Sequence, residues 1–239
     1  MVRSFNREEF DTFLIDEGVV ELREDKVKLS SGRKSNLYIN IRKLTDDVTR
    51  FDKLKDYAKD FINDKNLKPD YFLGVPEGMT KLGLIMTYTQ AQKDLMFSYE
   101  SYVSEGLSKD YPLPMARSKA KQHGSGKGQK FLGSVKGKAV VLEDVLTTGD
   151  SVISLVEDLA SKETEILAVI GVVDRLELRE DGLSVKEKLQ ELGVKYYAMT
   201  SVKTLLPLAY EILKPSKKVA KKINSYYKKY GCEYFKIII

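Results

Sequence analysis

Short apolar runs that alternate with helix-like stretches are the feature that most limits how this chain can fold. Runs with the composition of buried strands lie at 71–75, 138–144, 165–173 and 194–200, and amphipathic stretches at 81–93, 151–161 and 185–193 stand between them. Because a parallel sheet is covered by helices on both faces, this alternation predicts an α/β fold with a mostly parallel central sheet. Ligands of such sheets bind beyond the carboxyl ends of the strands, so the loops directly after the apolar runs are the candidate sites.

The segments before the alternation have simpler patterns. Residues 7–22 predict a helix with apolar side chains on one face, and residues 46–63 predict a second one. Between them, apolar and polar residues alternate over 37–42, which is typical of a strand.

The net charge of +5 is concentrated near the carboxyl terminus. Residues 214–236 hold eight lysines and one acid, so the rest of the chain is slightly acidic and its charge does not indicate a nucleic-acid binder. Cys232 is the single cysteine, which excludes an internal disulfide and favours a reducing compartment. The first residues lack the apolar core of a signal peptide, and no apolar run reaches the roughly 18 residues of a membrane span. We expect a cytoplasmic protein with no membrane partner.

The stretch VVLEDVLTTGDS, residues 140–151, combines groups that suit a sugar phosphate. Glu143 and Asp144 end an apolar run, and the small residues of 145–151 then open a helix. Unpaired backbone N–H groups at a helix amino terminus favour an anion, and hydroxyl side chains add donors. Carboxylates accept strong hydrogen bonds from sugar hydroxyls. The alternative is that the acids simply end a strand and the hydroxyl residues cap a helix.

This stretch resembles the phosphoribosyl pyrophosphate (PRPP) signature of type I phosphoribosyltransferases. In that family the loop holds the 5-phosphate and the two acids hold the ribose hydroxyls. The resemblance implies a PRPP-binding set at the end of the apolar run 138–144 and in the loop that follows it: Glu143, Asp144, Val145, Leu146, Thr147, Thr148, Gly149, Asp150 and Ser151.

A second segment, MARSKAKQHGSGKGQK, holds the only histidine of the chain. Cations on a glycine-rich segment form either a solvated loop or a mobile lid over anions. The segment is similar to the R-K-x-x-K-x-H-G catalytic loop of orotate phosphoribosyltransferases, with Arg117, Lys121 and His123 at matching positions and Ser118 in place of a lysine. The resemblance implies that these three bind PRPP, that Lys121 and His123 act in catalysis with Asp144, and that the 117–128 loop serves the neighbouring subunit of a homodimer.

Further matches concern the base and the pyrophosphate. The segment SSGRKSNLYIN resembles the one that lies against the base in that family, and the resemblance assigns orotate to Tyr38, Thr147 and Arg175. A local ion pair of Arg175 with Asp174 or Glu177 is the alternative for that arginine. The segment GVPEGMTKLG stands at the pyrophosphate loop, and we assign Lys81 as its PRPP-binding cation. Ser30 and Glu77 depart from the common family pattern.

The resemblance also implies an organisation for the chain. We expect a type I phosphoribosyltransferase fold with a small N-terminal hood and a flexible catalytic loop. The domain would cover 1–213, with the hood at about 1–45 and the core at about 46–213, followed by a lysine-rich extension over 214–239. Within that extension, tyrosines and aliphatic residues at helical spacing predict an amphipathic helix packed on the body, and contact with nucleic acid or an acidic partner is the alternative. The final residues could add an edge strand.

The implied reaction transfers the phosphoribosyl group of PRPP to orotate, giving orotidine 5′-monophosphate and pyrophosphate. Mg²⁺ is the expected cofactor, held mainly by PRPP rather than by direct protein ligands. PRPP and orotate are the expected partners, with a second copy of the chain and without nucleic acid. Two alternatives stay open: a phosphoribosyltransferase for another base, and a PRPP-sensing regulator whose lysine-rich tail binds nucleic acid.

Overall fold

A four-stranded parallel sheet forms the centre of the computed structural model, which describes residues 3–105, 111–124 and 128–233. Its strands are β3 (Tyr71–Gly74), β6 (Gly137–Leu146), β7 (Thr164–Asp174) and β8 (Tyr196–Ser201), in the order β3-β6-β7-β8. Their bounds agree with the predicted apolar runs, and neighbouring strands are parallel throughout. The predicted α/β class with a parallel central sheet is confirmed.

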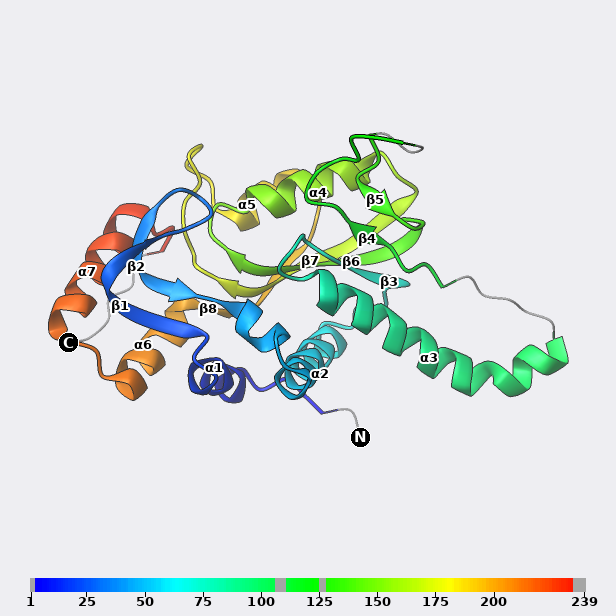
Figure 1. Cartoon of the computed structure of the whole chain (residues 1–239), viewed down its shortest axis with the longest axis horizontal. Coiled ribbons are helices and arrows are strands. Elements are labelled where there is room, and N and C mark those ends of the chain that lie inside the picture. The colour runs from blue at the N-terminus through cyan, green and yellow to red at the C-terminus, as the bar shows by residue number, and fades with distance from the viewer. Residues whose placement is uncertain (1–2, 106–110, 125–127, 234–239) are drawn as a thin grey trace.

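Helices cover both faces of this sheet (Figure 1). On one side lie α2 (Val48–Asp64), α3 (Thr80–Glu105) and α6 (Val202–Leu213), and on the other lie α4 (Asp150–Ala160) and α5 (Val185–Glu191).

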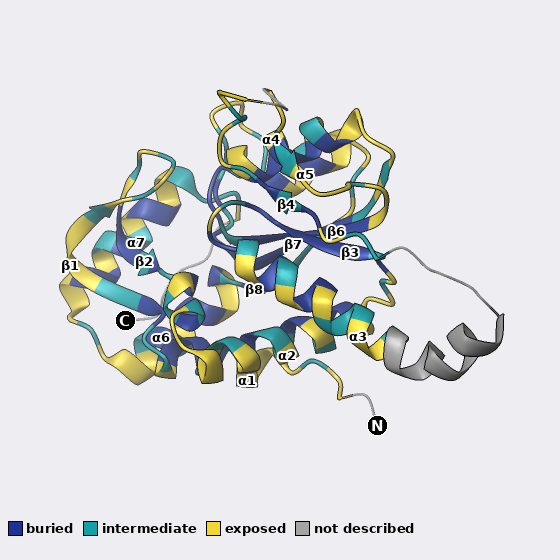
Figure 2. Cartoon of the chain, turned by 45° about the vertical axis from the view of Figure 1, so that its right-hand side comes forward, coloured by how far each residue is buried: buried dark blue, intermediate teal, exposed yellow. Residues whose placement is uncertain are grey.

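Alternation along the strands produces two apolar clusters. On β6, Val140 and Leu142 belong to the cluster beneath α2 and α6, whereas Ala139 and Val141 belong to the one beneath α4 and α5. The strands are therefore buried on both faces (Figure 2), as a parallel sheet between helices requires.

The N-terminal part is a small helix-and-hairpin unit. Helix α1 (Arg7–Asp16) is capped by the Asn6 side chain, and β1 (Val20–Lys28) pairs antiparallel with β2 (Lys34–Ile39), which leads into the 3-10 helix η1 (Ile41–Thr45). The predicted helix over 7–22 was too long, because Gly18 adopts a φ of 65° and ends the helical path before Val20 enters the hairpin. The strand predicted over 37–42 also lies earlier.

The carboxyl-terminal extension forms helix α7 (Lys217–Tyr230), which begins at a Ser216 cap. It contacts β1 and β2, and Figure 1 shows it beside that hairpin. Its buried residues are Val219, Ala220, Ile223, Tyr226 and Tyr227. The predicted amphipathic helix packed on the body is thus confirmed, whereas most of the predicted final strand falls on residues 234–239, outside the described part of the chain.

Two further points concern organisation. The domain boundaries stay a prediction, since residues of the hood, the core and α7 share one apolar cluster. Over the described ranges, none of the helices has both the length and the apolar character needed to cross a membrane.

Candidate active site

A small cavity of about 140 Å³ lies at the carboxyl edge of the sheet. Three separate parts of the chain form it: the turn at Ser30 and Ser31 with Arg42 of η1, the loop after β3, and the loop after β6. Its lining residues are Ser30, Ser31, Arg42, Pro76, Gly78, Glu143, Asp144, Val145, Thr147, Thr148, Gly149, Asp150 and Ser151. All the predicted PRPP-loop residues except the buried Leu146 are therefore brought together here.

The two acids at the end of β6 differ in their surroundings. Glu143 is buried, and its pKa is raised well above the ordinary value by burial and then by the charge of neighbouring Asp144. The Asp144 carboxylate is 21% exposed and faces the Arg42 guanidinium, with 4.0 Å between Asp144 Oδ2 and Arg42 Nε. A ligand that offers hydroxyl donors could therefore approach Asp144 directly.

The phosphate-type loop is shaped by Gly149, which caps α4 with a φ of 69°. A Cβ at this position would lie 2.7 Å from Val185 Cγ1, so both the backbone conformation and the packing of α5 require glycine. The first two residues of α4, Asp150 and Ser151, line the cavity, and the first backbone N–H groups of a helix have no acceptor within it.

Arg179 supports the same loop from the segment after β7. Its Nη1 donates to the Thr148 carbonyl and, over 2.9 Å, to Asp150 Oδ1. Thr148 Oγ1 in turn donates to Asp150 Oδ2 over 2.7 Å. These bonds hold the loop in place from its outer side.

The loop after β3 approaches the acids very closely. A Cβ at position 78 would lie 2.3 Å from Asp144 Oδ2, so only glycine allows this contact. Glu77 is exposed and does not line the cavity. Lys81, the predicted pyrophosphate cation, lies at the start of α3, and its Nζ donates to the Thr45 carbonyl over 2.9 Å, joining this region to η1.

The three residues predicted to bind orotate do not all line the cavity. Thr147 lines the cavity, but Tyr38 and Arg175 do not. Arg175 is only 1% exposed, and its guanidinium donates from Nε to Glu177 Oε1 over 2.7 Å and from Nη1 to the Leu37 carbonyl over 3.2 Å. The third nitrogen, Nη2, donates to Ser35 Oγ over 3.2 Å. The ion pair with Glu177, which the sequence offered as the alternative, is thus formed, and the orotate role of Arg175 stays a prediction.

Glu177 connects three elements. Its side chain is fully buried, and besides Arg175 it accepts from Arg33 Nη1 and from the Tyr226 hydroxyl, each over 2.9 Å. Arg33 comes from the turn before β2, Arg175 from the loop after β7, and Tyr226 from α7. One carboxylate thereby ties the hood and the carboxyl-terminal helix to the loop after β7.

The predicted lid lies apart from the cavity within this chain. Short strands β4 (Met115–Ala116) and β5 (Phe131–Leu132) pair antiparallel at its base, and the Arg117 N–H donates to the Lys130 carbonyl over 2.8 Å. Lys130 pairs with Asp158 at the carboxyl end of α4, whereas the cavity is at the amino end of that helix. Lys121 and His123 also lie outside the cavity lining, and part of the predicted loop, 125–127, is outside the described residues.

Several site residues were missed by sequence reasoning. Arg42 was counted only as a polar position of a strand, and Ser31 and Arg179 had no assigned role. Nothing local distinguishes an arginine such as Arg179 from a solvated one, because its partners in the phosphate-type loop lie about 30 residues away. Gly78 offered a signal, since glycine within a loop after a strand often marks a close approach.

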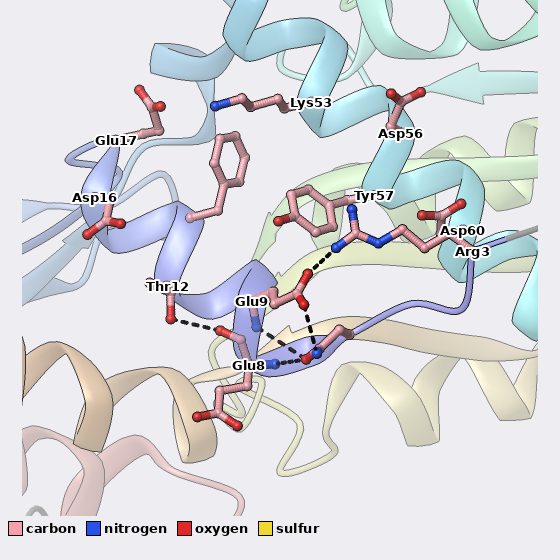
Figure 3. Close-up of a pocket in the computed structure, with 12 residues that line it drawn as sticks. Arg3, Glu8, Glu9, Thr12, Asp16, Glu17, Lys53, Asp56, Tyr57 and Asp60 are labelled. Atoms are coloured by element: carbon pink, nitrogen blue, oxygen red, sulfur yellow. Dashed lines mark hydrogen bonds and ion pairs between the residues drawn. The ribbon is translucent and has the colours of Figure 1, made fainter.

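A larger hollow lies elsewhere, between α1 and α2 (Figure 3). Its volume is about 650 Å³, and it is lined mainly by charged side chains, including Arg3 paired with Glu9. No residue of the loops that follow the sheet strands contributes to it, so we do not assign chemistry to this hollow.

Several of the known proteins that are similar to this chain are orotate phosphoribosyltransferases. No family model matches the chain. The orotate phosphoribosyltransferase of Pyrococcus abyssi is 30% identical over 203 residues, which cover 85% of this chain and 97% of that protein. The structure of orotate phosphoribosyltransferase from Aeropyrum pernix has a TM-score of 0.60 at 25% identity and covers 86% of this chain and 98% of that one. A structure of the Mycobacterium tuberculosis enzyme in complex with PRPP has a TM-score of 0.52 at 18% identity, covering 83% and 98%.

The sheet is parallel, as the sequence predicted, and the acid pair and the loop of 145–151 line one cavity at its carboxyl edge. Together with a relative that this chain matches over nearly its whole length, they settle the relationship. The chain belongs to the orotate phosphoribosyltransferase family.

Proposed function

We propose that this protein transfers the phosphoribosyl group of PRPP to orotate, giving orotidine 5′-monophosphate and pyrophosphate. The observation that carries the proposal is the convergence of the acid pair, the glycine-capped phosphate loop and the hood serines on one cavity in a member of this family. Curated relatives carry the name of this activity, and a related structure is described with PRPP.

In this proposal the loop of 145–151 binds the 5-phosphate of PRPP. The Gly149 conformation and the start of α4 direct backbone N–H groups toward an anion, and Thr147, Thr148 and Ser151 add hydroxyl donors. Arg179 keeps the loop in place from outside, so little reorganisation accompanies binding. Lys81 is the assigned cation for the pyrophosphate, and its amine would have to leave the Thr45 carbonyl to reach it.

Glu143 and Asp144 are assigned to the ribose. As the bond from the anomeric carbon to the pyrophosphate oxygen breaks, positive charge develops on the sugar, and a nitrogen of orotate forms the new bond. A carboxylate held beside the ring stabilises that charge, since a preorganised group requires no further rearrangement. The more exposed Asp144 is the acid in direct reach, while buried Glu143 accepts the Asp144 N–H over 3.1 Å from behind.

Arg117, Lys121 and His123 are assigned to the departing pyrophosphate, with His123 donating a proton to it. Because the base of their loop is fixed at the far end of α4 from the cavity, we propose that they act on the neighbouring subunit of a homodimer. Closing such a lid excludes the water that would otherwise hydrolyse PRPP.

The base subsite is assigned to the neighbourhood of Tyr38, Thr147 and Arg175. Arg33 and Arg175 share the single carboxylate of Glu177, so one positive charge of this buried group is uncompensated. An orotate carboxylate would neutralise it, and a guanidinium fork suits such a planar anion. To bind there, the carboxylate would replace the Leu37 and Ser35 oxygens as acceptor for Arg175.

The side chains at the cavity suit a Mg²⁺ ion that is held mainly by the phosphates of PRPP, rather than one held by the protein alone. Within the described residues no three His, Cys, Asp or Glu side chains group closely enough to hold a metal. Mg²⁺ is commonly held by substrate phosphates with few carboxylates, so PRPP would hold it mainly, with the exposed carboxylate of Asp144 nearby. When bound, it would act as a Lewis acid on the pyrophosphate.

We infer a location in the cytoplasm from the single cysteine.

The activity is tested by following the loss of orotate absorbance in the presence of PRPP and Mg²⁺. Lys121→Ala should lower turnover far more than PRPP binding, whereas Lys119→Ala, an exposed lysine of the same segment, should leave both nearly unchanged. Turnover on a purine or uracil, without turnover on orotate, would replace the substrate assignment.

Action across subunits is tested by mixing two inactive variants, Lys121→Ala and Asp144→Asn. If the loop serves its neighbour, activity returns at about a quarter of the sites, because half of the dimers are mixed and each mixed dimer contains one intact site. Mixtures that stay inactive after subunit exchange would contradict the arrangement.

A further inference from the structure

A third cavity, larger than the two already described, lies between α7 and the hairpin of β1 and β2. Its volume is about 850 Å³, within the usual range for small-molecule sites. We name it the basic groove and define it by its lining: Lys26, Gly32, Arg33, Lys34, Asn36, Lys218, Lys221, Lys222, Ser225, Tyr226, Lys229 and Tyr230. The turn at 30–34 separates it from the PRPP cavity, since Ser30 and Ser31 line one and Gly32 to Lys34 line the other.

The charge of the groove has one sign. Seven of its lining side chains are cationic and none is acidic. Arg33 pairs with Glu177, which it shares with Arg175, and Lys222 donates to the Glu24 carbonyl over 2.7 Å. Among the described residues, Lys26, Lys34, Lys218 and Lys221 make no ion pair. Like charges gathered from three elements around a hollow repel one another and favour an anion placed between them.

The aromatic residues of the groove indicate what kind of anion fits. Tyr226 is buried, and its hydroxyl is bonded to Glu177. The ring of Tyr230 is half-buried and already in contact with Arg33, Lys229 and Tyr226, whose nearest groups lie 4.6 Å, 4.8 Å and 4.9 Å from its centroid. Binding of single-stranded nucleic acid depends on aromatic faces that are open to stacked bases. Because both rings are engaged by neighbouring side chains, we take the lysine ammonium groups as the main recognition elements and phosphate groups as their target.

We propose that the basic groove binds a ligand that carries a short chain of phosphate groups, about three in a row. Each phosphate brings one or more charges, so such a chain matches the four unpaired lysines. Compact ammonium groups on flexible stems suit several phosphate oxygens at once, in contrast to the fixed fork of arginine. The phosphates can belong to free tripolyphosphate or to a nucleoside triphosphate.

Isothermal titration of the intact protein with tripolyphosphate at about 0.15 M salt tests the proposal. Lys218→Glu/Lys221→Glu reverses two unpaired groove lysines and should weaken the groove binding about 100-fold, taking about tenfold for each charge-assisted contact. Lys217→Glu/Lys228→Glu reverses two exposed lysines of the same helix that do not line the groove, and should change affinity less than about threefold. Both variants should retain turnover of PRPP and orotate, which separates this test from that of the proposed function.

Equal effects of the two double variants, or no effect of either, would overturn the proposal in favour of nonspecific attraction. Binding of ATP that is clearly tighter than that of tripolyphosphate, and lost in Lys218→Glu/Lys221→Glu alone, would identify the nucleotide as the source of the phosphates. Equal affinities of ATP and tripolyphosphate would identify the phosphate chain alone as the group that the groove recognises. An oligonucleotide of 20 thymidines that binds more tightly than either, with the same dependence on Lys218 and Lys221, would replace the proposal with nucleic-acid binding.

Discussion

Removing the charge of Glu177 should destabilise the protein severely. Glu177→Gln keeps the shape of the side chain but leaves the guanidinium groups of Arg33 and Arg175 without a counter-charge, and these are 13% and 1% exposed. Breaking a buried ion pair by removing one partner costs about 3–5 kcal/mol. In a protein of this size each kcal/mol lowers the Tm by about 2–4 °C. The expected loss is therefore about 6–20 °C.

Tyr226→Phe probes the same carboxylate from α7. It removes one hydrogen bond to a charged acceptor, for which about 1.5–3 kcal/mol is typical, and so should lower the Tm by about 3–12 °C. Since the two residues touch, the double variant should lose less than the sum of the single losses. Glu180→Gln makes the same chemical change at an exposed position of the same loop and should shift the Tm by no more than about 2 °C.

Thermal unfolding followed by circular dichroism measures these shifts at one pH and salt concentration. The prediction is refuted if Glu177→Gln and Glu180→Gln both unfold within about 2 °C of the unchanged protein. Strictly additive effects of Glu177→Gln and Tyr226→Phe would show that α7 does not act through this carboxylate.

Three further predictions concern single positions. Burial raises the folded-state pKa of Glu143, so the stability gained from its protonated form is present at low pH and lost as pH rises through that pKa. The gain in Tm from Glu143→Gln without ligand should therefore grow from pH 5 to pH 8, and a constant gain would contradict the shift. Gly149→Ala should destabilise more than Gly182→Ala, because both positions have positive φ but only the first Cβ meets another side chain, that of Val185; equal losses in urea unfolding would remove the packing argument. Burial, followed by the charges of Asp174 and Glu233, raises the pKa of the Cys232 thiol to about 11. Its reaction with a thiol reagent at pH 7.5 should therefore be about 100-fold slower than that of an unperturbed cysteine, and a rate equal to that of a model peptide would refute the shift.

The parts of the site that are contiguous in sequence could be predicted. Glu143, Asp144 and the loop of 145–151 combine strand end, acids, small residues and helix start within a few positions, so local chemistry alone indicates an anion and a sugar. The bounds of the strands in the central sheet could be predicted equally well, because burial on both faces makes the apolar runs continuous. The bounds of β6 and β7 extend only slightly beyond those runs.

Contacts made across the fold could not be predicted in this way. The burial of Arg175 depends on Glu177, on main-chain atoms of β2 and on a tyrosine of α7, which are brought together only by tertiary packing. The basic groove likewise draws its lysines from segments almost 200 residues apart. In the first helix, the helical pattern continued past Asp16, and the left-handed conformation of Gly18 was not evident from periodicity.

The bond from Tyr226 to Glu177 also has a consequence for how the chain is made. The amino-terminal part of a protein leaves the ribosome first, and it begins to fold while the rest is still being synthesised. Arg33, Arg175 and Glu177 are synthesised well before Tyr226, so a nascent chain can form the sheet while this buried carboxylate still lacks one of its donors. Completion of the cluster therefore waits for the synthesis of α7, and a chain that stops before α7 would leave the Glu177 carboxylate without its Tyr226 donor.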